Sequence, residues 1–126
     1  MMRALCVAYL ALALLTLPTA VAAHDEEGGT PERLTVRGEV LDMACYLSHD
    51  GKGPQHRKCA LRCAEQGQPI GLLTKDGRVY LLMADHADTS AFDAARKLAG
   101  QEVEVEGEPA GRDGLHGLTV LAVKKI

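Results

Sequence analysis

The sequence predicts a small, mainly β domain in which five strands close into a barrel. Five segments of the 126-residue chain carry strand-type patterns, and turn residues separate them. One helical pattern falls between the third and fourth of these segments. A second helical pattern, which contains cysteines, lies in an insert at residues 43–67, between the first two strands.

The first three strands come from residues 34–41, 70–74 and 78–83. The first alternates apolar and polar residues, as a half-buried strand does. The other two flank Lys75-Asp76-Gly77, whose Asp-Gly step is typical of a tight hairpin turn. We therefore expect the second and third strands to pair with each other.

The last two strands are predicted at residues 101–107 and 115–123, joined by a turn over 111–114. The first of them again alternates with period two, placing valines on one face and glutamates on the other. The hydroxyl residues at 89–90 can begin a helix, and Gly100 can stop it.

The helix in the insert is predicted from Pro54 to Gln66, because proline is well tolerated in a first turn and Gly67 can end the helix. The complete order of elements is that of an OB-fold barrel. The insert then occupies the loop between strands one and two, beside which OB folds commonly bind ligands. This analogy of topology does not by itself define a function.

The N-terminal 23 residues are typical of a secretory signal peptide. Arg3 precedes the apolar run CVAYLALALLTL, and small residues at 21–23 supply a cleavage site. The run is too short to span a membrane comfortably. We expect a periplasmic or secreted protein with a flexible leader at 24–33, an OB-like domain at 34–126 and no stable membrane span after cleavage.

Composition and the absence of known motifs argue against two classes of function, nucleic-acid binding and catalysis. The chain has a net charge of −3, no tryptophan and few aromatic residues, which argues against nucleic-acid binding because such sites need basic grooves and aromatic platforms. It carries no nucleophile motif, P-loop or dinucleotide fingerprint, which favours a binding role over an enzyme.

The insert contains the chemically informative residues, Cys45, Cys59, Cys63, His49 and His56. On a helix, His56, Cys59 and Cys63 share one stripe, and Cys45 at the end of the first strand can fold back over it. Three thiolates with the imidazole of His56, or alternatively His49, would form a four-coordinate site. Soft ligands of this kind favour Cu(I) or Zn(II).

Two other roles remain open for these cysteines. In an oxidising compartment Cys45 could pair with Cys59 or Cys63, which would give a disulfide-stapled module that binds a protein or small ligand. Thiol redox chemistry is the second alternative, although the C-x-x-C of thioredoxin-like proteins is missing. The basic residues Lys58 and Arg62 are expected to favour ionised thiols.

The segments GEVLDMACYL, HRKCALRC and PIGLLTKDGRVYLLMADH resemble small exported bacterial proteins with an OB-like sequence and no characterised function. Their shared pattern is C-Y-L followed by H-x-x-C-A-x-x-C, and the resemblance covers roughly residues 36–123. It implies that Cys45, His56, Cys59 and Cys63 belong to one motif, and it implies no particular activity.

Protein isolated from its native host should lack about 23 N-terminal residues, because the charged start, short apolar run and small residues direct cleavage near Ala23. Intact-mass measurement checks this. A full-length, soluble cytoplasmic species would contradict export.

Overall fold

The computed structural model describes residues 32–126. The predicted signal peptide at 1–23, and all but the last two residues of the predicted leader at 24–33, lie outside this range. In chain order the elements are β1 (Leu34–Asp42), α1 (Met43–His49), α2 (Arg57–Glu65), β2 (Ile70–Leu73), β3 (Val79–Ala84), α3 (Ser90–Lys97), β4 (Glu102–Arg112) and β5 (Leu115–Lys125).

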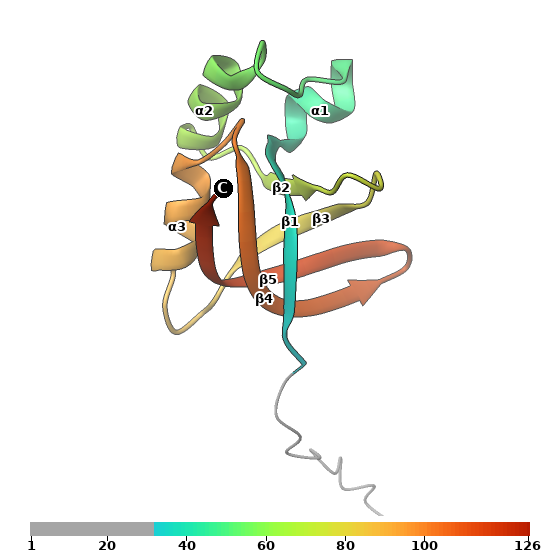
Figure 1. Cartoon of the computed structure of the whole chain (residues 1–126), viewed down its shortest axis with the longest axis vertical. Coiled ribbons are helices and arrows are strands. Elements are labelled where there is room, and N and C mark those ends of the chain that lie inside the picture. The colour runs from blue at the N-terminus through green and yellow to red at the C-terminus, as the bar shows by residue number, and fades with distance from the viewer. Residues whose placement is uncertain (1–31) are drawn as a thin grey trace, which may run out of the picture.

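The strands form one closed barrel in the order β1-β2-β3-β5-β4. All neighbouring pairs are antiparallel except β3 and β5, which run parallel because α3 crosses between β3 and the β4–β5 hairpin. This order confirms the predicted OB-like barrel. Figure 1 shows α1 and α2 together at one end of the barrel, with α3 beside α2 along its side.

Closure of the barrel depends on β1, which pairs with β4 over residues 34–39 and with β2 over residues 39–42. Gly38 lies where the strand passes from one partner to the other. A Cβ atom at this position would lie 2.2 Å from the carbonyl oxygen of Leu73. The missing side chain therefore lets β1 approach the end of β2.

The core fills the barrel and the space between it and the helices. Val103 and Val105 are fully buried, and Glu104 between them is not, as the period-two pattern predicted. Phe92 and Ala95 on α3, and Leu98 and Ala99 directly after it, pack into the same core. The buried residues of this core cluster are Val40, Ala60, Ala64, Ile70, Leu72, Leu82, Ala95, Ala99, Val103, Val105, Leu118 and Val120.

The structure differs from the prediction mainly in the insert. Residues 43–49 form helix α1, so Cys45 lies in a helix and not at the end of the first strand. The second helix begins at Arg57, and residues 54–56 form a turn before it. Asp42 caps α1 with its side chain, which explains why the strand stops there.

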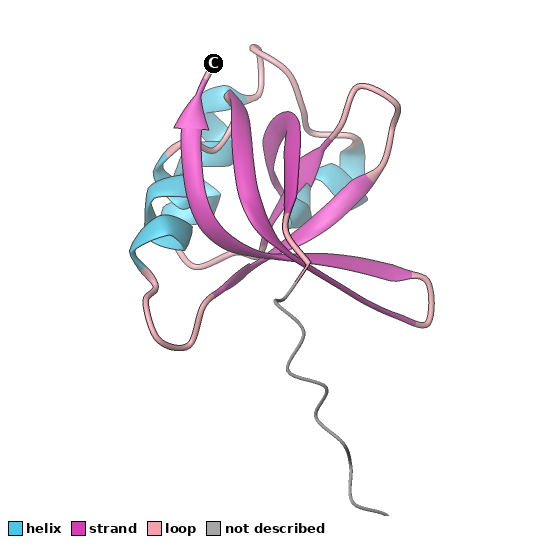
Figure 2. Cartoon of the chain, turned by 60° about the horizontal axis from the view of Figure 1, so that its bottom comes forward, coloured by secondary structure: helices cyan, strands magenta, loops and turns pink. Residues whose placement is uncertain are grey.

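The β4–β5 hairpin is also longer than predicted, because β4 continues to Arg112. Its tip extends away from the barrel, as both views show (Figures 1 and 2). Between residues 32 and 126, none of the helices combines the length and the apolar character needed to cross a membrane.

Replacing Gly38 with Ala should lower the free energy of unfolding by about 1–3 kcal/mol, because the new methyl group would overlap backbone atoms. The matched control is Gly111→Ala at the exposed end of β4, where the nearest atom would lie 3.3 Å from the new Cβ. Urea unfolding measures both variants. Equal losses at the two positions would contradict a special role of Gly38 in closing the barrel.

Candidate metal-binding site

Asp42 connects the barrel to the insert. It is the last residue of β1, its side chain is fully buried, and its Oδ1 accepts hydrogen bonds from the backbone N–H groups of Ala44 (3.1 Å) and Cys45 (3.4 Å). These N–H groups belong to the first turn of α1 and would otherwise lack partners. The carboxylate therefore starts α1 and sets the position of Cys45.

Helix α1 presents Cys45 and His49 on one face, since they are four residues apart. The helix ends at Asp50, which adopts the left-handed conformation with φ of 56°. The N–H of Gly51 then donates to the carbonyl of Cys45 over 3.1 Å. This turn at the end of α1 brings the backbone of Gly51 next to the Cys45 side chain.

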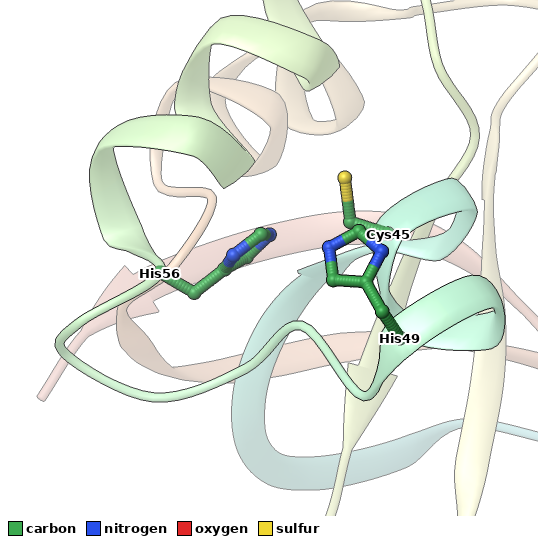
Figure 3. A group of neighbouring side chains, drawn as sticks. All are labelled: Cys45, His49 and His56. Atoms are coloured by element: carbon green, nitrogen blue, oxygen red, sulfur yellow. The ribbon is translucent and has the colours of Figure 1, made fainter.

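The connection from α1 to α2 is tied to the barrel by one hydrogen bond, in which the N–H of Gly53 donates to Oε1 of Glu39 over 2.7 Å. The chain then reaches His56, the residue immediately before α2. The rings of His49 and His56 meet edge to face with centroids 5.7 Å apart. Figure 3 shows both rings and the Cys45 sulfur converging between α1 and the start of α2.

His56 faces the buried oxygen of Asp42 that the helix cap does not use. The two atoms, Nε2 of His56 and Oδ2 of Asp42, are 3.8 Å apart, which is too long for a hydrogen bond. Both are buried and have no hydrogen-bond partner in the described structure. Buried polar atoms are normally paired, so this gap is suited to a cation or a water molecule.

Gly51 makes room for the imidazole. A Cβ atom at residue 51 would lie 2.7 Å from Nε2 of His56 and 3.0 Å from Cβ of Cys45. A side chain there would displace the ring from Asp42. The glycine is therefore part of the geometry of the site, although it can bind nothing itself.

The remaining thiols come from α2, where Cys59 and Cys63 are four residues apart. The ligand atoms form two groups of three, each with all its members within 4.8 Å of one another. One group is Cys45, Cys59 and Cys63, and the other is Cys45, His49 and His56. The structure thus brings together all five residues proposed from the sequence, with Cys45 common to both groups.

Two features of this arrangement were missed in the sequence. His56 groups with Cys45 and His49, because it precedes α2 and does not continue the stripe of Cys59 and Cys63. Asp42 was not proposed as a site residue at all. An aspartate just after a strand and before a short helical segment is a recognisable N-cap signal, but it was assigned to neither element.

The surroundings of Cys45 and Cys63 favour the protonated form of these two thiols in the metal-free protein. The pKa of the Cys45 thiol is raised to about 12, and Asp42 is the main cause. Its carboxylate attracts the proton of the thiol and repels the negative charge of a thiolate. Burial of the thiol raises the pKa further. Burial is the main cause of the raised pKa of Cys63. The expectation that basic neighbours keep these thiols ionised is wrong for both residues, since Asp42 and burial outweigh them.

The raised pKa values have a consequence for stability. The folded, metal-free protein holds the Cys45 proton more tightly than an unfolded chain whose thiol has the ordinary pKa of 9.0. This contribution to stability is present below pH 9.0 and is lost as pH rises from there towards about 12. A metal that binds the thiolate must displace the same proton.

The three thiols of the described chain are free. Their spacing of at most 4.8 Å is close to what one ion requires, since sulfurs 2.3 Å from a tetrahedral Zn(II) lie about 3.8 Å apart. Small side-chain movements would therefore close the cysteines around a metal. The same proximity would let Cys45 form a disulfide with one α2 thiol after such a movement.

Comparison of the chain with protein-family models, curated proteins and solved structures yields no match. The resemblance to small exported OB-like proteins stays a prediction.

Replacing Asp42 with Asn should lower the pH at which Cys45 ionises in the metal-free protein, because the carboxylate that raises its pKa is removed. Asparagine caps helices about as well as aspartate, so α1 should persist. Ultraviolet thiolate absorbance against pH gives the measurement. Asp50→Asn, which removes an exposed carboxylate at the other end of α1, is the control and should leave the Cys45 titration in place.

Proposed function

We propose that this protein is exported and binds a soft metal ion, Cu(I) or Zn(II), through its Cys/His cluster. The observation that carries the proposal is the convergence of three free thiols within 4.8 Å, with two imidazoles beside them. Its role would be metal handling outside the cytoplasm, or a binding surface that the metal supports. Export rests on the signal-type N-terminus.

Three features favour a metal over a structural disulfide. Three thiols cannot all pair within one chain. A disulfide would also give no role to the imidazoles of His49 and His56. Finally, the unpartnered Nε2 of His56 is a lone-pair donor suited to a metal when the ring is neutral.

The burial of the ligands suits reversible binding. Cys59 and His49 are exposed, whereas Cys45, His56 and Cys63 are partly buried. An incoming ion can therefore meet an exposed ligand first and then be enclosed by the others. A site with both exposed and partly buried ligands is consistent with transfer of metal between proteins. The cluster lies on α1, α2 and the connection between them, and these helices cover one end of the barrel (Figure 1).

Protein purified anaerobically should bind Cu(I) or Zn(II), and Cys45→Ser should abolish most of the binding, because Cys45 belongs to both groups of ligands. Metal analysis after gel filtration, together with competition against a chelator of known affinity, measures the loss. His116→Ala, which removes an exposed histidine on β5, is the control and should bind as the wild type does.

Titration of free thiols in freshly isolated protein tests the alternatives. A Cys45–Cys59 or Cys45–Cys63 disulfide, with no metal bound after reduction, would contradict the proposal and support the disulfide-stapled binding module. A disulfide that forms and breaks reversibly, again without metal binding, would support thiol redox chemistry. A chain that retains Cys6 would show one more thiol than the three in the described domain.

A further inference from the structure

We propose that the cluster holds two metal ions and that the thiolate of Cys45 bridges them. One ion would bind Cys45, Cys59 and Cys63, and the other would bind Cys45, His49 and His56. This inference rests on the proposed function and extends it, because it assigns a second metal position and a separate role to Cys45.

The first argument is the arrangement of the ligand atoms. They form two compact groups of three that share only the sulfur of Cys45. The thiol pair comes from α2, whereas the histidines lie at the end of α1 and just before α2. A thiolate has enough lone pairs to bind two ions, so the shared sulfur can complete both groups.

The second argument comes from the buried atoms beside the histidine group. Nε2 of His56 and Oδ2 of Asp42 lack hydrogen-bond partners and lie 3.8 Å apart. Zn(II) accepts imidazole, carboxylate and thiolate ligands and is usually four-coordinate. Asp42 lies outside this group of three ligands, but its fully buried carboxylate faces His56 and can supply compensating negative charge beside the second position.

The third argument is charge balance. Three thiolates and the Asp42 carboxylate would carry four negative charges at this end of the barrel. The Asp42 charge is fully buried, and a buried charge is costly unless it is compensated. Two divalent ions would neutralise them, whereas one would leave two negative charges. A single ion bound by the three thiolates would also leave both histidines and Oδ2 of Asp42 without a role.

The experiment is to titrate the anaerobic, metal-free protein with ¹¹³Cd(II), a soft ion that stands in for Zn(II) and can be observed by NMR. We expect two equivalents to bind and two resonances to appear, with the sulfur-rich position downfield of the histidine position. The bridge through Cys45 should produce scalar coupling between the two ¹¹³Cd nuclei, which separate ligand sets would not give.

Matched variants assign each resonance. The double variant His49→Ala/His56→Ala should retain one equivalent and only the downfield signal, and Cys59→Ser/Cys63→Ser should retain only the upfield signal. His86→Ala/His116→Ala, which removes two exposed histidines outside the cluster, should still bind two equivalents. Circular dichroism of each metal-free variant verifies that the fold is kept.

The outcomes separate this inference from the proposed function. One bound equivalent that requires the thiols would overturn the second position and leave metal binding intact. Two resonances without coupling would overturn the bridging role of Cys45. No binding of Cd(II), Zn(II) or Cu(I) would overturn both the inference and the proposed function.

Discussion

The organisation of the cluster depends on the carboxylate of Asp42. One of its oxygens satisfies the first turn of α1, and the other faces His56 without a partner of its own. The side chain is fully buried at the point where β1 leaves the barrel. A buried carboxylate is stable only when it is well paired. Asp42 therefore couples the start of α1 to the group that pairs with its second oxygen, beside His56.

The barrel supplies a rigid base for an insert that has little core of its own. No residue of α1 is buried, and α2 contributes Ala60 and Ala64 to the core. Helix α2 is further constrained at Gly100, where an added Cβ atom would lie 2.7 Å from Cα of Arg57. Cys59 and Cys63 are thus held on a helix with a buried face. Cys45 and His49 lie on a helix without buried residues, which is held by the Asp42 cap and by contacts of Met43 with Pro69 and Gly71.

This difference in anchoring matters for metal chemistry. Bound metal would link α1 to α2 and stabilise the less buried part of the insert, since binding free energy at a site absent from the unfolded chain is also folding free energy. The raised pKa values of Cys45 and Cys63 favour the protonated form of these two thiols in the metal-free protein. Metal occupancy, proton release and order in α1 would therefore change together.

The sequence by itself determined the barrel. Period-two alternation, the Asp-Gly turn and the position of the α3 pattern are local signals, and together they define the strands and their order along the chain. It also identified the five Cys and His residues of the cluster, since their chemistry is evident from residue type. Only the tertiary structure decided that Cys45 lies in a helix, that His56 joins His49 and Cys45, and that Asp42 belongs with them. The cap of Asp42 and the left-handed residue at Asp50 are local features of α1. The approach of His56 to Asp42, and the space that Gly51 leaves for its ring, are contacts between segments that no local pattern encodes.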